Sequence, residues 1–221
     1  MKIEISNLSF DYPTGEFGIQ IPELQIESGQ SLALVGPSGC GKTTFLNLLS
    51  ALITPQSGGI RVGELALKGL GDRERRAYRA GQTGYVFQDF GLVDYLTARE
   101  NILYTYLVTD RPVPVDLDNR IQNLAESFGI DHILHKKPAR ISQGEKQRVA
   151  ICRAILPRPQ LILADEPTGN LDPENKAAIL EHLFAQASET GATLVVVTHD
   201  IALSGRFDKV VDFAQYGKRG A

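Results

Sequence analysis

Hydrophobic residues follow two different patterns along this chain, and the pattern changes near residue 30. Before that point, apolar and polar residues alternate in Lys2–Ile5, in Ile19–Ile21 and in Leu24–Ile26. Alternation is typical of strands that bury only one face. Residues 1–30 are therefore predicted to form mainly an antiparallel β layer.

After residue 30, the apolar residues come in continuous runs. The clearest runs are Leu32–Val35, Gly84–Phe87, Leu161–Ala164 and Leu194–Val197. A strand without a polar face is buried on both sides, as it is in a parallel sheet covered by helices. The chain is therefore predicted to have an α/β core.

The stretch between the second and third runs has helical features instead. Apolar residues at helical spacing are Ile121, Leu124, Ala125 and Phe128. A helix over Gly144–Leu156 is expected to end before Pro157 and Pro159, because proline cannot continue a helix. We expect a single domain over 1–221, divided into an antiparallel layer (1–30), a core (31–89 and 158–221) and an inserted helical subdomain (90–157).

The first continuous run leads into a glycine-rich segment, Gly36-Pro37-Ser38-Gly39-Cys40-Gly41-Lys42-Thr43. Its spacing matches the pattern in which the backbone N–H groups of a loop surround phosphate oxygens. Lys42 supplies a positive charge for the β- and γ-phosphates, and the Thr43 hydroxyl is a ligand for Mg²⁺. The segment predicts a nucleoside triphosphate site whose binding residues are Gly36, Ser38, Gly39, Cys40, Gly41, Lys42, Thr43 and Thr44.

Two carboxylates, Asp165 and Glu166, follow the third apolar run. Ligands of open α/β sheets bind at the carboxyl ends of the strands. Asp165 is predicted to hold Mg²⁺, and Glu166 to polarise the water that attacks the γ-phosphate. Such a pair is also common as a simple strand-end cap, and the glycine loop upstream favours the catalytic interpretation.

A third segment, Arg140-Ile141-Ser142-Gln143-Gly144-Glu145-Lys146-Gln147-Arg148, precedes the carboxylate strand. With the glycine loop, it resembles the ATP-binding-cassette ATPases, whose signature LSGGQ stands here as Ile141–Glu145. The resemblance implies a P-loop NTPase core of the RecA-like kind. It also implies that Ser142, Gly144 and Glu145, at a helix N-terminus, close over the γ-phosphate held by a second copy. Gln143 and Glu145 depart from the signature, adding bulk and negative charge beside that phosphate.

Shorter motifs of the family also occur in this chain, in the order in which the family has them. By resemblance, Gln88 senses Mg²⁺ and the attacking water, Asp172 couples the two sites of a dimer, and His199 contacts the γ-phosphate. Tyr12 matches the position whose ring stacks on adenine, although it could equally pack a strand. The resemblance thus implies the catalytic residues Glu166, Lys42, His199 and Gln88, and the Mg²⁺ ligands Thr43, Gln88 and Asp165.

The segment Asp165-Glu166-Pro167-Thr168-Gly169-Asn170-Leu171-Asp172 is similar to the corresponding segment in one branch of the family, the lipoprotein-releasing, macrolide-exporting and cell-division ATPases. The resemblance implies a homodimer that closes around two ATP and Mg²⁺ and drives a separate polytopic membrane permease, in export or extrusion. In the family, the permease contacts the stretch after the glutamine. The apolar residues of that stretch, which could equally be subdomain core, are Phe90, Leu92, Val93 and Tyr95.

Two other functions stay open at this point. One is a soluble cassette ATPase that remodels a protein complex without moving a solute. The other is a regulatory module that closes on ATP but hydrolyses it slowly, which Gln143 and Glu145 favour.

Charge and hydropathy narrow the expected partners and location. The net charge is −3 and the basic residues are scattered, so no nucleic-acid partner is expected. No apolar run approaches the roughly 20 residues that span a bilayer, so no direct membrane insertion is expected. We expect a cytoplasmic protein, peripheral on the cytoplasmic face of the inner (plasma) membrane. Cys40 and Cys152 match no metal-binding spacing and are expected to be free thiols.

Overall fold

The computed structural model describes residues 1–13, 17–169, 173–200 and 204–219. One of its two sheets is antiparallel and contains β1 (Ile3–Asp11), β2 (Phe17–Ile26), β4 (Ser57–Val62), β5 (Leu65–Ala66) and β10 (Gly217–Arg219), in the order β10-β2-β1-β4-β5. The alternating stretches at Ile19–Ile21 and Leu24–Ile26 belong to one continuous strand, β2. Pro22, which has no N–H to donate, is tolerated there because it lies opposite Asn7, whose φ of 46° takes it out of the ladder.

The second sheet is parallel and contains β3 (Ser31–Val35), β6 (Thr83–Val86), β7 (Leu161–Asp165), β8 (Thr193–Val197) and β9 (Lys209–Asp212), in the order β6-β7-β8-β3-β9. The four strands predicted from continuous apolar runs are confirmed. Strand β9 was not predicted, because it has only two apolar residues, Val210 and Val211, between polar neighbours. It pairs with β3 alone and forms one edge of the sheet.

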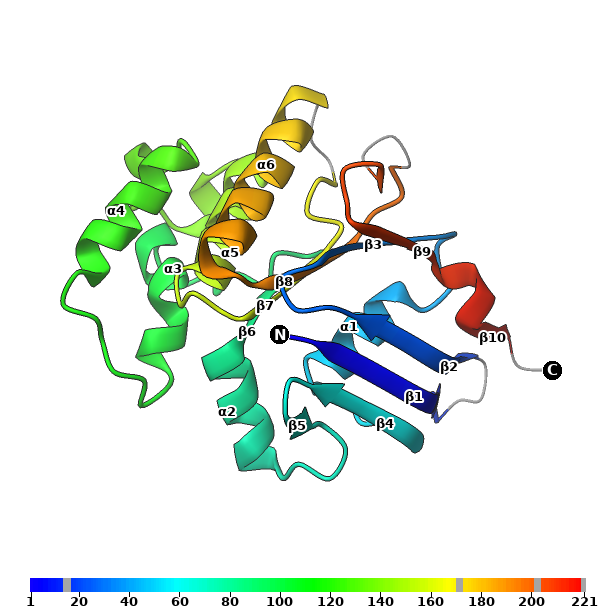
Figure 1. Ribbon diagram of the computed structural model, residues 1–221. Helices are drawn as coiled ribbons and strands as arrows, with labels where there is room; N and C mark the ends of the chain where they lie inside the picture. The colour runs from blue at the N-terminus through cyan, green and yellow to red at the C-terminus, as the bar shows by residue number, and fades with distance from the viewer. Residues whose placement is uncertain (14–16, 170–172, 201–203, 220–221) are drawn as a thin grey trace.

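Alternate side chains of the parallel strands enter two different cores, which explains why these strands have no polar face. On one side, Leu32, Leu163 and Val195 pack with the antiparallel sheet. On the other side, Ala33, Ile162 and Val196 pack with helices. The antiparallel sheet, together with the helical residues Phe45–Leu49, therefore covers one face of the parallel sheet, and the helices that contain Ile151 and Leu183 cover the opposite face (Figure 1).

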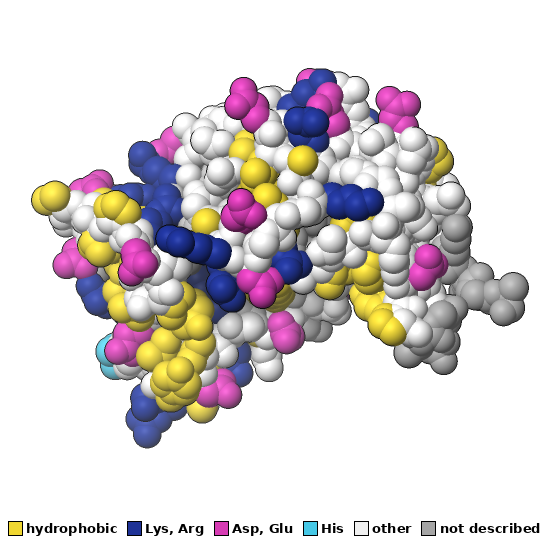
Figure 2. Space-filling model, turned by 90° about the horizontal axis from the view of Figure 1, so that it is seen from below, with side chains coloured by type: hydrophobic (Ala, Val, Ile, Leu, Met, Phe, Trp, Pro, Cys, Tyr) yellow, Lys and Arg dark blue, Asp and Glu magenta, His cyan; other side chains and the backbone are white. Residues whose placement is uncertain are grey.

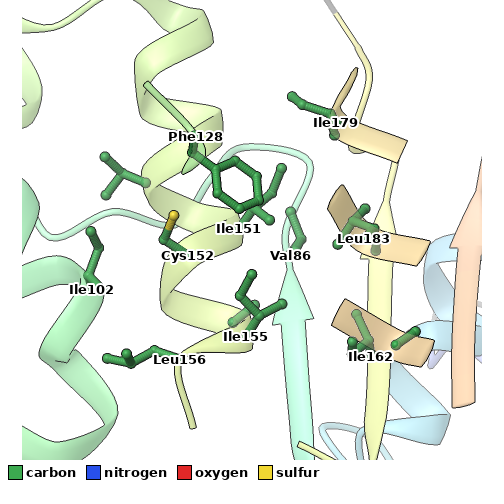
Figure 3. Packing of buried hydrophobic residues seen from close by; sticks show 14 of the residues in the cluster. Val86, Ile102, Phe128, Ile151, Cys152, Ile155, Leu156, Ile162, Ile179 and Leu183 are labelled. Atoms are coloured by element: carbon green, nitrogen blue, oxygen red, sulfur yellow. The ribbon is translucent and has the colours of Figure 1, made fainter. Parts of the chain in front are cut away.

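The helices are α1 (Lys42–Leu49), α2 (Asp72–Gln82), α3 (Ala98–Leu107), α4 (Leu117–Ser127), α5 (Gln143–Ile155) and α6 (Pro173–Thr190), and short 3₁₀ turns cover Asp131–Ile133, Pro138–Arg140 and Phe213–Tyr216. Helices α3 and α4 lie to one side of the parallel sheet, and α5 lies between them and the sheet (Figure 1). In Figure 3, Cys152 and Ile155 of α5 lie between Ile102 of α3 and Val86 of β6. The predicted helix over Gly144–Leu156 is confirmed as α5, shifted by one residue. Across the part of the chain that the structure describes, no helix has the length and apolarity to cross a membrane.

Candidate functional site

The glycine loop lies between the end of β3 and the start of α1, where the antiparallel sheet packs against it. Gly41 caps α1 with a φ of 101°, in the left-handed region that glycine adopts without strain. A Cβ atom at Gly41 would lie 2.5 Å from Cγ2 of Ile19 and 2.8 Å from Cζ of Phe17. Glycine is therefore required here both by the backbone angle and by strand β2, which supports the loop from the side.

Lys42 is buried at the start of α1, and its ammonium group is held by the loop itself. The Nζ atom donates hydrogen bonds to the carbonyl oxygens of Gly36 at 2.8 Å and Pro37 at 2.9 Å, and lies 3.7 Å from Sγ of Cys40. These partners fix a positive charge inside the curve of the loop. An anion bound by the backbone N–H groups would meet that charge directly.

Asp165 lies at the carboxyl end of β7 and is 2% exposed. Burial raises the pKa of its carboxyl, and a hydrogen bond with Thr43 opposes that shift. The Oδ1 atom is buried and has no hydrogen-bond partner among the described residues. A buried carboxylate oxygen without a partner beside a threonine hydroxyl is the donor set that Mg²⁺ prefers, so Thr43 and Asp165 fit the ion.

Glu166 has a backbone φ of 50°, which is unusual for a residue with a side chain. Its N–H donates to the carbonyl oxygen of Val197 at 3.1 Å, which fixes it to the end of β8. The side chain lies against His199, with Oε2 and Nδ1 separated by 3.5 Å. The structure therefore brings together two residues that the sequence places on different strand ends.

One cavity of about 480 Å³ collects eight of the predicted site residues. Its lining is Phe17, Ser38, Gly39, Gly41, Lys42, Thr43, Thr44, Gln88, Glu166 and Val197. Tyr12 lies at its border, since its hydroxyl is 3.1 Å from Oγ1 of Thr44 and its ring is 6.4 Å from that of Phe17. Asp172 lies outside the described residues. Phe17 and Val197 were missed in the sequence, where an aromatic residue and a valine within strands gave no signal beyond packing.

The predicted signature residues lie at the N-terminus of α5 and do not line this cavity. Ser142 caps the helix: its N–H and its hydroxyl both donate to Oε2 of Glu145, at 2.7 and 2.8 Å, and the Glu145 N–H donates back to Oγ at 3.3 Å. His132 lies 3.3 Å from the other carboxylate oxygen. The hydrogen bonds to Ser142 lower the pKa of Glu145. Glu145, one of the residues that depart from the signature, therefore completes a capping box.

Two buried polar residues that the sequence did not single out hold the segment after Gln88. Arg153 of α5 donates to the carbonyl oxygens of Phe90 at 2.5 Å and Gly91 at 2.6 Å. Asn101 of α3 is fully buried, accepts from the N–H of Val93 at 2.8 Å, and donates to the carbonyl oxygens of Val93, Leu96 and Thr97. Arg153 is a lone polar residue in an apolar helical stretch, and that pattern is the signal from which it could have been found. Asn101 follows Arg99 and Glu100, and no pattern in the sequence marks it.

Comparison with known proteins agrees with this geometry. Residues 19–169 match the family model described as ABC transporter. The chain is 39% identical to a lipoprotein-releasing system ATP-binding protein, LolD 1, of Rhodopirellula baltica, over 93% of this chain and 90% of the relative. It is 40% identical to the macrolide export ATP-binding/permease protein MacB of the same organism, over 95% of this chain and 31% of that longer protein.

The fold also matches a solved structure. The dimeric post-hydrolysis state of the ATP-binding cassette MJ0796, bound to ADP and Pi, superimposes with a TM-score of 0.86 at 29% identity, covering 99% of both chains. The predicted fold class, a P-loop NTPase core with a β subdomain, is confirmed, and so is the resemblance stated from the sequence motifs. The chain therefore belongs to the ABC transporter family, as an ATPase subunit.

Proposed function

We propose that two copies of this ATPase hold two ATP molecules between them, and that closure of the pair drives a membrane permease in export or extrusion. One observation carries the proposal: the cavity gathers the glycine loop and Glu166, while Ser142 and Glu145 lie outside its lining. A site completed by the N-terminus of α5 from a second copy accounts for both facts. The solved relative of matching fold is a dimer.

In this proposal, the residues of one chain divide the work of hydrolysis. Glu166 orients the attacking water and accepts its proton, and His199, 3.5 Å away, holds the carboxylate and reaches the γ-phosphate. Lys42 balances the charge that develops on the phosphate oxygens, after it exchanges its loop carbonyl partners for phosphate. Thr44 positions the hydroxyl of Tyr12 so that the ring can stack on adenine.

Thr43, Asp165 and Gln88 are the residues that would hold Mg²⁺. The ion, when bound with ATP, neutralises negative charge on the β- and γ-phosphates. Gln88 and Thr43 both line the cavity, and Asp165 has a buried oxygen without a partner. Gln88 follows the end of β6, Asp165 ends β7 and Thr43 lies in the first turn of α1, so three different elements would supply the ligands of the ion.

A permease partner and a location at the cytoplasmic face of the membrane are supported by the relatives. Their names describe a lipoprotein-releasing system and a macrolide exporter. The apolar stretch after Gln88 divides into two parts in the structure: Leu92 packs against the helical core, whereas Tyr95 is 74% exposed. An exposed aromatic side chain in this stretch is available for a partner, and the packed leucine is not.

The test is the Glu166→Gln variant, measured with ATP and Mg²⁺ by analytical ultracentrifugation and phosphate release. We expect turnover to fall by about 100-fold or more and a stable ATP-bound dimer to accumulate, because the amide cannot accept the proton of water. Glu189→Gln is the matched control, since Glu189 is a surface carboxylate paired with Arg158. Normal turnover in Glu166→Gln would contradict the assigned role.

The partner is tested separately, by affinity capture of the Glu166→Gln protein from detergent-solubilised native cells. A stoichiometric polytopic membrane protein among the captured partners supports the permease assignment. Capture of soluble partners alone, with ATP-dependent dimerisation intact, would instead favour a cassette that remodels a protein complex.

A further inference from the structure

Four basic side chains gather on the turn that precedes α5. They are His135, Lys136, Lys137 and Arg140, which line a surface cavity of about 580 Å³, and no other described residue lines it. We call residues 135–140 the basic turn; its second half is the 3₁₀ turn Pro138–Arg140. A cavity lined only by basic side chains favours an anionic occupant.

The positive charge of the basic turn is not used inside the protein. Among the residues that the structure describes, none of these four side chains forms an ion pair or a hydrogen bond, and all but Lys136 are exposed. Lys137 contributes to the lowered pKa of Glu100, but less than the hydrogen bonds of that carboxylate to its helix cap do. Lys136 has the same weaker effect on the pKa of Glu145. Both carboxylates are engaged in helix capping, so the turn keeps an excess of positive charge.

The backbone of the basic turn is fixed against α3. The N–H of Ala98, at the start of α3, donates to the carbonyl oxygen of Lys136 at 2.8 Å. The N–H of Arg99 donates to the carbonyl oxygen of Leu134 at 3.0 Å, and Pro138 is buried. The backbone that carries the charged side chains is therefore in place before any partner binds, which lowers the entropic cost of binding.

The same contacts place the basic turn beside the stretch after Gln88, where we propose that the permease binds. Tyr95, the exposed aromatic residue of that stretch, precedes Ala98 by three residues, so about 11 Å of chain at most separates them. In Figure 2, Lys and Arg side chains lie among hydrophobic ones on the left of the molecule, which is the side of α3 and α4 in Figure 1. A permease crosses the bilayer, so residues beside its contact stretch would lie near lipid headgroups.

We propose that the basic turn binds the anionic phospholipid headgroups of the membrane that holds the permease. The proposal rests on the proposed function, because the permease brings the turn to the bilayer. The chain as a whole has a net charge of −3, which opposes its approach to an anionic surface. The local excess of positive charge on the turn supplies the attraction. The turn thereby orients the ATPase on the membrane and adds to the hold of the permease.

Two other anionic partners fit the basic turn less well. A nucleic acid is bound along an extended basic stripe, and one turn of four residues does not provide it. The phosphates of ATP have their own site, because none of these four residues lines the cavity of the glycine loop. A membrane surface needs no long track, since its headgroups surround the permease on every side.

Co-sedimentation with vesicles tests the proposal on the purified chain, without a permease. One set of vesicles is phosphatidylcholine alone, and the other contains about one third phosphatidylglycerol, which is anionic. Each lysine or arginine near such a surface strengthens binding about fivefold, so the three in the turn should raise the partition coefficient roughly 100-fold. High salt should remove the difference. Equal partition into the two kinds of vesicle, including no binding to either, would overturn the proposal.

The double variant Lys137→Gln/Arg140→Gln locates the effect. It should weaken binding to the anionic vesicles about 30-fold, because it removes two of the three permanent charges without breaking a contact of the fold. Arg61→Gln/Lys68→Gln is the matched control, since it removes two exposed positive charges from the region of β4 and β5 and should bind like the wild type. Equal losses in the two double variants would show an effect of overall charge and refute the role of the turn.

Two further measurements separate the alternatives. Displacement from the vesicles by millimolar glycerol 3-phosphate would assign the turn to free phosphate esters and overturn the membrane assignment, and we expect none. ATP turnover and ATP-dependent dimerisation are measured in solution for every variant. Normal turnover with equal partition into both vesicles would contradict the headgroup site alone, whereas selective vesicle binding by a chain that neither dimerises nor hydrolyses ATP would contradict the proposed function alone.

Discussion

Glu145 offers the sharpest test, because its carboxylate stabilises the fold while the proposed dimer would place it near the phosphate of a second copy. The carboxylate accepts from the N–H and the hydroxyl of Ser142, at 2.7 and 2.8 Å. Glutamine at this position can also complete a capping box, but without the charge. The Glu145→Gln variant therefore preserves the shape of the helix N-terminus and removes one negative charge from it.

The two effects of this change have opposite signs. Charged hydrogen bonds contribute about 1 kcal/mol more to stability than neutral ones, so the melting temperature should fall by about 2–4 °C or less. A unit charge about 8 Å from another interacts by about 0.5 kcal/mol at an effective dielectric constant of 80 and about 2 kcal/mol at 20. Removing that repulsion should tighten ATP-driven dimerisation by roughly 2-fold to 30-fold at each site.

The assay combines Glu145→Gln with the slow Glu166→Gln background and measures the dimer dissociation constant with ATP by analytical ultracentrifugation. Glu126→Gln is the control, since Glu126 accepts a side-chain hydrogen bond on the surface of α4. Equal or weaker dimerisation, together with a lower melting temperature, would show that Glu145 has only its capping role. The pKa of Glu145 is lowered in the fold, so its stabilising effect is complete above 4.5, and the difference in melting temperature should vanish as the pH falls below that value.

Three further predictions follow from the site. Thiol alkylation should modify Cys40, which is 9% exposed and lies 3.7 Å from Nζ of Lys42, and this modification should block ATP turnover. Bound ATP should protect Cys40 from the reagent. Cys152, whose pKa is raised by complete burial, should not react in the native protein. Unchanged turnover after complete modification of Cys40, followed by mass spectrometry, would contradict this. Asp165→Asn should raise the free energy of unfolding without nucleotide by about 1 kcal/mol at pH 8, because burial raises the pKa of Asp165 by disfavouring its charged form, and the amide carries no charge. Denaturant titration should show the gain shrink as acid protonates the wild type. Tyr12→Ala should weaken ATP binding about tenfold in calorimetry, whereas Tyr12→Phe should nearly retain it, and equal affinities for all three proteins would exclude stacking.

The sequence predicted the strands of the parallel sheet well, because burial on both faces requires continuous apolar runs such as Leu161–Ala164. The sequence analysis missed β9, an edge strand with only two valines, because its pairing with β3 stabilises it despite its few apolar residues. The linear order of the motifs was sufficient to identify the family. Arg153 and Asn101 belong to no motif, and the backbone groups that they hold became known only from their buried hydrogen bonds in the structure.

By itself, the sequence determined the glycine loop, the carboxylates at a strand end and the family, because these depend on residue type and local spacing. Only the tertiary structure decided which of these residues meet. Glu166 lies beside His199 because β7 and β8 are neighbours in the sheet, a pairing between segments far apart in the chain. The structure also shows that Glu145 caps its own helix. Three arginines from α2 and α5 line one groove, because helix packing brings together side chains that are far apart in the sequence.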